Sequence, residues 1–216
     1  MVGHDIRNPL QAIVSELYLA KTELDGVASE EVRKNLAESI VNIENEVDYI
    51  NKIVQDLQDY AKPLKPVAKV TNIRGIIDEI LTKNHLPENV KVSRRISEQA
   101  NQFVSDPDLL KRIIANLISN AVQAMPKGGK LSVDANIKAG DLFLSVEDTG
   151  VGVPEEARSK LFTPLFTTKS KGQGFGLSVV KRMTEALGGT VTFESEVGEG
   201  TKFIVRLPHR EIERFK

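Results

Sequence analysis

Apolar residues recur in the first 61 residues at alternating steps of four and three, and this spacing constrains the fold more than any other feature of the sequence. The series runs over residues 6–24, stops at Asp25-Gly26 and resumes over residues 36–61. Such spacing places one narrow apolar stripe along a helix. Ser29 and the two glutamates after it are typical of a helix start. The sequence therefore predicts a hairpin of two long helices.

A hairpin of this kind buries its stripe only in part, because each helix has a single neighbour. Pairing with a second copy would complete a four-helix bundle. We therefore expect a homodimer, held together through residues 5–61. The heptads alone leave open a plain coiled-coil hairpin without chemistry.

Pro63 and Pro66 end the second helix, and beyond them strands and helices alternate. This change predicts two domains, residues 1–63 and 64–216. Strand candidates span residues 67–70, Val90–Ile96, 102–105, 130–137, 142–147, 190–195 and 201–207; helix candidates span Ile73–Lys83, 107–125 and 176–187. The order predicts an α+β layer fold, a mixed sheet with helices on one face. Residues 154–175 have no steady period and are predicted to form a long functional loop.

Composition excludes several classes of function. With 29 Lys plus Arg against 30 Asp plus Glu, the net charge of -1 gives no general attraction to nucleic acid or anionic membrane. The absence of cysteine excludes a disulfide framework, a thiol nucleophile and a Cys-rich metal site. Because no apolar run reaches about 18 residues, we expect no membrane segment in this stretch and a cytoplasmic location. The full-length protein could still be attached to a membrane through domains upstream.

Two signals in the second half suggest nucleotide chemistry. Asn116 and Asn120 stand four residues apart on a predicted helix, and amide oxygens can bind a Mg²⁺ ion that takes its other ligands from water and phosphate. Asp148 follows a strand and could accept a hydrogen bond from the amine of adenine, while Gly150 and Gly152 would let a flat ring approach the backbone. Taken singly, an asparagine pair of this kind more often caps a helix or bonds within the core, and the Asp-Gly sequence could equally form a turn.

A third signal is Gly172-Gln173-Gly174-Phe175-Gly176-Leu177, which opens a predicted helix. Glycines before a helix N-terminus expose backbone N–H groups that can hold phosphate. The spacing matches neither the P-loop nor the dinucleotide motif.

In this order, with Leu161-Phe162-Thr163-Pro164-Leu165-Phe166 between the second and third, the segments resemble the N, G1, F and G2 boxes of the histidine-kinase ATP-binding domain. That domain has the GHKL, or Bergerat, fold, shared with Hsp90, gyrase B and MutL. The resemblance covers roughly residues 68–207 and implies ATP and Mg²⁺ as cofactors. The segment 120–129 looks most like the nitrogen-regulation type of sensor kinase, although Gln123 stands where many members carry a basic residue.

The resemblance also implies roles for individual residues. Asn120 would coordinate Mg²⁺ with help from Asn116, and adenine would be bound by Asp148, Gly150, Gly152 and Thr201. Phosphates would be held by Gly172, Gly174 and Gly176, with Phe175 and Leu177 in the same segment. Residues 154–175 would be a mobile lid, anchored by Phe162 and Phe166, with Lys169 or Lys171 in reach of phosphate.

The segment His4-Asp5-Ile6-Arg7-Asn8-Pro9-Leu10 resembles the H-box of the dimerisation and phosphotransfer domain. The heptad assignment turns His4, Asp5 and Asn8 away from the seam. An unprotonated imidazole is a good phosphoryl acceptor, and Asp5 could take its proton. Asp5 and Asn8 also resemble a phosphatase motif of this family; alternatively, Asn8 only adjusts the backbone before Pro9. For His85 and His209 we expect surface positions without a task.

These observations predict the catalytic core of a sensor histidine kinase. Mg-ATP would phosphorylate His4, and the phosphoryl group would pass to an aspartate of a response regulator, which the chain could also dephosphorylate. A nucleotide-binding scaffold without turnover, an ATP-driven clamp and a serine kinase of the anti-sigma type are the alternatives. Family members usually continue the first helix upstream of the histidine, so we expect a piece of a longer protein.

Overall fold

The computed structural model describes residues 2–24, 29–61, 63–83, 86–167 and 174–209; within these ranges it gives only the backbone of residues 2–9, 23, 48–49, 52–53, 55–56, 58–59, 61 and 83. The chain forms two compact units, residues 1–62 and residues 63–216. In the part of the chain that is described, no helix has both the length and the apolar character that a membrane span requires.

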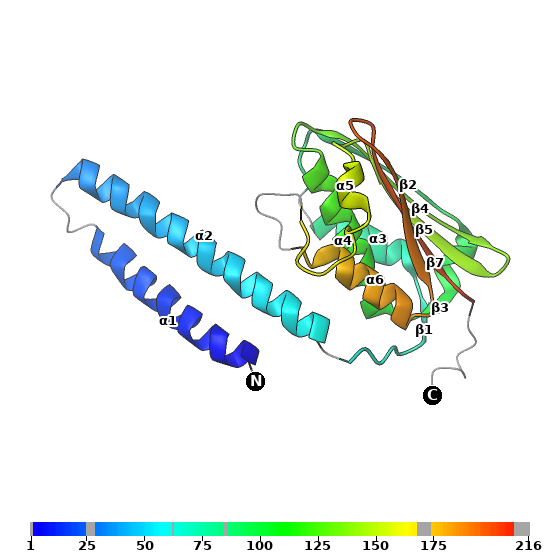
Figure 1. The fold of residues 1–216 in the computed structure, drawn as a ribbon, viewed down its shortest axis with the longest axis horizontal. Coiled ribbons are helices and arrows are strands. Elements are labelled where there is room, and N and C mark those ends of the chain that lie inside the picture. Colours follow the sequence, from blue (N-terminus) through cyan, green and yellow to red (C-terminus); the bar gives the residue numbers. More distant parts are fainter. Residues whose placement is uncertain (1, 25–28, 62, 84–85, 168–173, 210–216) are drawn as a thin grey trace. The chain divides into compact units, whose positions relative to one another are not determined.

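The first unit is a helical hairpin of α1 (Val2–Glu23) and α2 (Glu30–Ala61) (Figure 1). Helix α2 begins directly after Ser29, as the sequence predicts. The Arg33 N–H donates to the Ser29 carbonyl over 2.9 Å. Two glutamates occupy the first turn, where the positive end of the helix dipole stabilises carboxylates.

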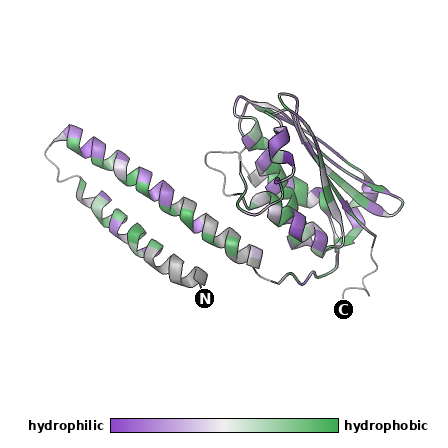
Figure 2. Ribbon diagram, in the orientation of Figure 1, coloured by the Kyte–Doolittle hydropathy of each residue, from purple (hydrophilic) through white to green (hydrophobic). Residues whose placement is uncertain are grey.

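The two helices bury five of their described apolar side chains in the hairpin. The buried residues are Leu10, Leu17, Ile40, Val47 and Val54. A second series on α2 stays 39–45% exposed at seven-residue steps, and we call it the exposed α2 stripe: Leu36, Ile43, Ile50 and Leu57. Figure 2 shows hydrophilic and hydrophobic residues alternating along this helix. One hairpin therefore leaves half of the heptad positions of α2 without cover.

The second unit contains a five-stranded sheet in the order β2-β4-β5-β7-β6. Its strands are β2 (Val90–Ile96), β4 (Gly129–Lys138), β5 (Asp141–Asp148), β6 (Thr190–Glu196) and β7 (Gly200–Leu207). Strands β2 and β4 run parallel, and all other neighbours run antiparallel. The register of β5 and β7 places Asp148 opposite Thr201, so that two segments far apart in the sequence meet at one end of the sheet.

Helices α3 (Ile73–Lys83), α4 (Pro107–Ala124) and α6 (Gly176–Ala186) lie on one face of this sheet (Figure 1). Strands β4 and β5 turn alternate apolar side chains toward the helices, namely Leu131, Val133, Ala135, Leu142, Leu144 and Val146, all buried. This arrangement confirms the predicted mixed sheet with helices on one face. Strands β1 (Lys69–Thr71) and β3 (Phe103–Ser105) form a separate two-stranded sheet, which the sequence did not predict.

Asp106 fixes the start of α4. Its Oδ1 accepts hydrogen bonds from the backbone N–H groups of Asp108 (2.9 Å) and Leu109 (3.0 Å), and its Oδ2 accepts one from Val67 (2.7 Å). An N-cap of this kind stabilises a helix by about 1 kcal/mol. The same carboxylate thus positions α4 and holds the backbone just after the proline segment.

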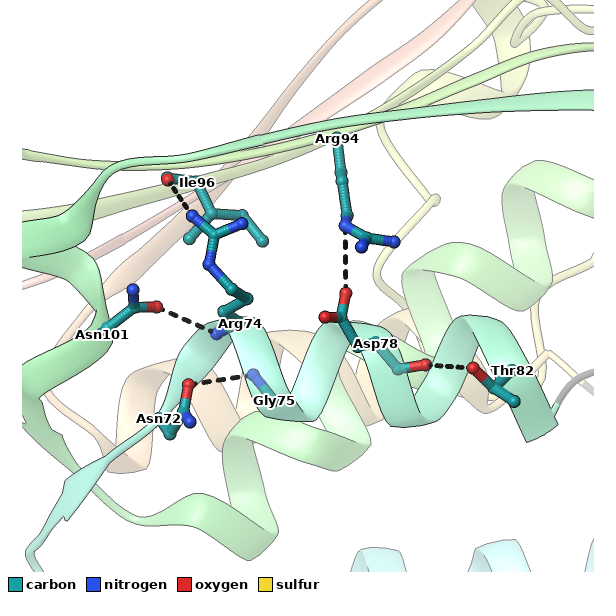
Figure 3. Close-up of polar contacts among 8 residues, drawn as sticks. All are labelled: Asn72, Arg74, Gly75, Asp78, Thr82, Arg94, Ile96 and Asn101. Carbon is teal, nitrogen blue, oxygen red and sulfur yellow. Dashed lines mark hydrogen bonds and ion pairs between the residues drawn. The ribbon is translucent and has the colours of Figure 1, made fainter.

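Helix α3 is fastened to the edge strand β2 by side-chain contacts (Figure 3). The Arg74 guanidinium donates to the Ile96 carbonyl over 2.7 Å, and Arg94 forms an ion pair with Asp78 over 3.0 Å. Charged side chains on an edge strand also discourage pairing with other chains. Two short elements were missed by the sequence reasoning, the 3-10 helix Glu98–Gln102 and α5 (Glu155–Arg158).

Candidate functional site

The two asparagines of α4 lie against the first turn of α6. Asn116 and Asn120 are both half-buried. A Cβ atom added to Gly176 would lie 3.2 Å from Asn116 Oδ1 and 3.6 Å from Asn120 Nδ2. Asn116 Nδ2 donates to the Arg112 carbonyl over 2.8 Å, which leaves Oδ1 as its atom nearest to Gly176. The fold thus brings two amide side chains to a helix N-terminus.

Helix α6 begins directly after Phe175, which is 1% exposed. The Phe175 carbonyl accepts hydrogen bonds from Ser178 Oγ (2.8 Å) and the Val179 N–H (2.9 Å), and Leu177 is half-buried. The first N–H groups of a helix have no acceptor within the helix and can bind an anion. The buried phenyl ring therefore anchors a first turn whose N–H groups are suited to phosphate.

Gly174 lies against the loop that follows α5. Its φ is +70°, and a Cβ atom there would lie 2.4 Å from the carbonyl carbon of Leu165. Both conditions favour glycine over any other residue. The predicted phosphate residue Gly172 and the two predicted lysines, Lys169 and Lys171, lie outside the described residues.

Phe162 attaches the predicted lid to the sheet. Its ring packs edge-on against Phe193 of β6 and Phe203 of β7, with centroids 6.0 and 6.4 Å apart. Phe166, the second predicted anchor, is half-buried. Aromatic pairs at such distances contribute about 0.5–1.5 kcal/mol beyond the area they bury.

Asp148 ends strand β5 and is 4% exposed. Its Oδ1 accepts a hydrogen bond from the Gly150 N–H over 2.8 Å. A Cβ atom on Gly150 would lie 2.4 Å from the carbonyl oxygen of Ala124, which accepts a hydrogen bond from the Val151 N–H over 3.1 Å. The loop after β5 therefore rests directly on the last residue of α4, and the close approach requires a glycine.

The β6–β7 hairpin holds the far side of this loop. A Cβ atom on Gly152 would lie 2.1 Å from the Glu196 carbonyl oxygen, and the Gly198 N–H donates to the Val151 carbonyl over 3.0 Å. The loop that carries the predicted adenine residues is thus clamped between α4 and the hairpin.

Ser195 was missed by the sequence reasoning, although it contacts several of these elements. Its Oγ lies 2.9 Å from Thr201 Oγ1 and accepts a hydrogen bond from the Val153 N–H over 2.9 Å. Its carbonyl accepts a hydrogen bond from the Arg158 guanidinium over 2.7 Å. Thr201 is 5% exposed and faces its register partner Asp148. A lone serine near the end of a strand gave no signal, because its partners are distant in the sequence.

His4, Asp5 and Asn8 lie in helix α1 of the first unit. Only the backbone of these three residues is described. His85 also lies outside the described residues. His209 is exposed, and its backbone N–H donates to Asp141 over 3.1 Å. A hydrogen bond from the Arg206 side chain lowers the pKa of the Asp141 carboxyl below its ordinary value, and the hydrogen bond from the His209 N–H adds a smaller effect in the same direction.

No cluster of three or more His, Cys, Asp or Glu side chains suited to a metal occurs among the described residues. The amide oxygens of α4 are hard, neutral ligands, which fit a Mg²⁺ ion that keeps water and phosphate ligands. The site beside Gly176 therefore suits a metal–phosphate complex better than a free metal ion.

Comparison with known proteins gives two family matches. Residues 1–65 match the "His Kinase A (phospho-acceptor) domain", and residues 105–211 match the "Histidine kinase-, DNA gyrase B-, and HSP90-like ATPase" family. The chain is 31% identical to the sensor histidine kinase ZraS of Salmonella typhimurium over 96% of this chain and 44% of the relative. It is 33% identical to sporulation kinase D of Bacillus subtilis over 95% of this chain and 40% of the relative. The chain thus spans less than half the length of these relatives.

Two solved structures share the fold. Full-length ShkA in complex with AMPPNP aligns with a TM-score of 0.77 at 24% identity, over 96% of this chain and 44% of that one. The histidine kinase ThkA in complex with the response regulator TrrA aligns with a TM-score of 0.71 at 25% identity, over 99% of this chain and 61% of that one. Together with the two family matches, in the order that the sequence predicts, they show that the chain belongs to the histidine kinases and comprises a phosphoacceptor domain followed by an ATPase-like domain.

Proposed function

We propose that this chain binds Mg-ATP in its second unit, phosphorylates His4 in its first unit, and transfers the phosphoryl group to an aspartate of a response regulator. The observation that carries the proposal is the contact of Asn116 and Asn120 with the first turn of α6. It joins neutral metal ligands to a positively polarised helix end, which is the pairing that a metal-bound triphosphate requires.

Adenine is bound at the end of β5. Asp148 accepts a hydrogen bond from the exocyclic amine of adenine, because a carboxylate can only accept hydrogen bonds and the amine donates them. Gly150 and Gly152 keep the loop flat against its neighbours, and Thr201 forms the adjacent wall. Burial strengthens this hydrogen bond, because water competes for it less than at an open surface.

The phosphates lie at the N-terminus of α6, held by backbone N–H groups around Gly174 and Gly176. Asn120, assisted by Asn116, holds Mg²⁺, which when bound neutralises charge on the phosphates. Gly172, Lys169 and Lys171 are assigned to the same phosphates on the family resemblance alone. Phe175 and Leu177 keep the first turn in place.

The imidazole of His4 attacks the γ-phosphorus while the bond from that phosphorus to the ADP oxygen breaks. The proton on the other ring nitrogen passes to Asp5, so that ADP leaves and a neutral phosphohistidine ring remains. Asn8, one turn further along α1, orients water for hydrolysis of the partner's phosphoaspartate.

The first unit forms a homodimer through the exposed α2 stripe. Four large apolar side chains at seven-residue steps match the seam of a four-helix bundle, and each remains 39–45% exposed in a single chain. The stripe therefore predicts the face at which a second copy packs.

Incubation with radiolabelled ATP and Mg²⁺ tests the proposal. Label that is lost in acid and stable in base is expected, because phosphohistidine has this behaviour and phosphoserine does not. His4→Ala should abolish labelling and preserve ATP binding in calorimetry, whereas the matched control His209→Ala, at an exposed histidine, should change neither. Labelling that survives His4→Ala would disprove the assignment of the acceptor.

A further inference from the structure

The Ser195 hydroxyl has three polar contacts, and together they determine the direction of every hydrogen bond it makes. The Val153 N–H donates to its Oγ over 2.9 Å. The Gly200 carbonyl oxygen lies 2.9 Å away, and Thr201 Oγ1 also lies 2.9 Å away. A hydroxyl has one hydrogen to donate and two lone pairs with which to accept. Three contacts therefore saturate it.

Only one assignment of hydrogens makes all three contacts favourable. A carbonyl can only accept, so Ser195 must donate its single hydrogen to Gly200. Thr201 must then donate its own hydrogen to Ser195. In the reverse assignment, the Gly200 and Ser195 oxygens would face each other at 2.9 Å without a hydrogen between them, and this contact would be repulsive.

We infer that Ser195 is a specificity-determining residue of the nucleotide site, because it makes Thr201 an obligatory hydrogen-bond acceptor toward the bound base. This inference rests on the proposed ATP site. Thr201 is 5% exposed and lies opposite Asp148, and among the described residues its hydroxyl contacts only Ser195. With its hydrogen engaged, Thr201 turns only lone pairs toward a ligand.

An acceptor-only wall discriminates between purines. Adenine carries a 6-amino group that donates, whereas hypoxanthine and guanine carry a 6-oxo group that accepts. A carboxylate and an acceptor-only hydroxyl side by side therefore favour a 6-amino purine and repel a 6-oxo purine. A threonine that could rotate its hydrogen freely would satisfy either base, because a hydroxyl can donate or accept.

The test compares binding of ATP and ITP, which differ at this position of the base, by calorimetry in the presence of Mg²⁺. We expect the wild-type chain to prefer ATP, and we expect Ser195→Ala to reduce the ratio of the two dissociation constants roughly five- to tenfold, the factor that one hydrogen bond contributes. The change should come chiefly from tighter ITP binding, because the freed Thr201 hydrogen can bond the 6-oxo group.

Arg158→Met is the matched control. The Arg158 guanidinium donates to the Ser195 carbonyl over 2.7 Å, so its removal loosens the same strand without changing the hydroxyl pair. It should weaken ATP and ITP equally and keep their ratio. A second variant, Thr201→Val, removes the acceptor and should also reduce the ratio, and the double variant with Ser195→Ala should show no further change.

The possible results distinguish the role of Ser195 from the existence of the ATP site. A ratio that stays at the wild-type value in both Ser195→Ala and Thr201→Val overturns the inference and leaves the proposed ATP site standing. A ratio that falls equally in Arg158→Met would show that strand anchoring is responsible, and it would overturn the inference as well. A wild-type chain that binds neither nucleotide would overturn the proposed function and the inference together.

Discussion

Two glycines of the β6–β7 hairpin offer a matched pair of substitutions whose costs can be worked out from the structure. Both have positive φ, +86° at Gly198 and +121° at Gly200. A Cβ atom on Gly198 would meet nothing within 4 Å in the described chain, whereas one on Gly200 would lie 1.9 Å from the Asp148 carbonyl oxygen. Alanine at either position costs about 1–2 kcal/mol for left-handed backbone. At Gly200 the neighbouring strand must also move.

We expect Gly198→Ala to lower the Tm of the second unit by about 2–8 °C, because 1 kcal/mol corresponds to about 2–4 °C for a domain of this size. Gly200→Ala should cost more than about 4 kcal/mol, as severe packing faults do, and lower the Tm by at least about 8 °C. Thermal unfolding followed by circular dichroism measures both values on the whole chain.

The atom that a side chain at Gly200 would displace is the carbonyl oxygen of Asp148, the residue proposed to bind adenine. The two variants should therefore also differ in ATP binding. Calorimetry should find weaker binding for Gly200→Ala and nearly unchanged binding for Gly198→Ala. Equal losses of Tm in the two variants would refute the reasoning, because the backbone cost would then account for everything and the predicted clash would be absent.

Thr184 is fully buried, and its Oγ1 has no hydrogen-bond partner among the described residues. Because an unpaired buried hydroxyl destabilises the fold, Thr184→Val should stabilise the protein by about 1 kcal/mol. The same unfolding assay should show a Tm raised by about 2–4 °C. The pKa of Asp141 is lowered in the folded state, so its ionised carboxylate adds to the free energy of unfolding at every pH above the unfolded-state pKa. This contribution is lost as the pH falls through the folded-state pKa. Arg206→Gln removes the largest cause and should raise the pKa of Asp141 toward its ordinary value in a carbon-detected NMR titration; an unchanged pKa would contradict this account. Ile43→Glu should dissociate the proposed dimer by placing a charge in its seam, and light scattering measures the loss of mass. Val41→Glu is the control, at an almost equally exposed position outside the exposed α2 stripe (44% against 45%), and it should leave the mass unchanged.

Elements with a clear period and clear ends could be predicted from the sequence. Helix Ile73–Lys83 and strand Val90–Ile96 have the predicted bounds in the structure, because each carries its own pattern of apolar residues. Helix α5 was missed, since four residues are too few to show a period. The separate pairing of β1 with β3 was missed for another reason: strand partners depend on the tertiary fold, which local patterns do not encode.

The residues of the candidate site also fall into those that a sequence pattern identifies and those that only the fold identifies. Residues such as Asn116 and Asp148 stand in segments with a recognisable residue pattern, and the sequence could nominate them. Ser195 contacts Val153 and Thr201 through a hydroxyl that is chemically unremarkable in the sequence, so only the fold identifies it. Sequence reasoning finds residues that carry a motif, and it misses those that act through neighbours brought together by folding.

The pairing of Asp148 with Thr201 also has a consequence for the order in which the protein is made and folds. Strands β4 and β5 are neighbours in the sequence and can pair early, because closing a short loop costs little entropy. Strand β7 is the last element of the described chain, and residues 149–199, which include α6, separate it from β5. Until β7 has left the ribosome, Asp148 ends a strand with an open edge. A nascent chain can then have α4 and its asparagines in place while the proposed adenine site still lacks Thr201. Nucleotide binding at the proposed site therefore requires that β7 has been made and has paired with β5.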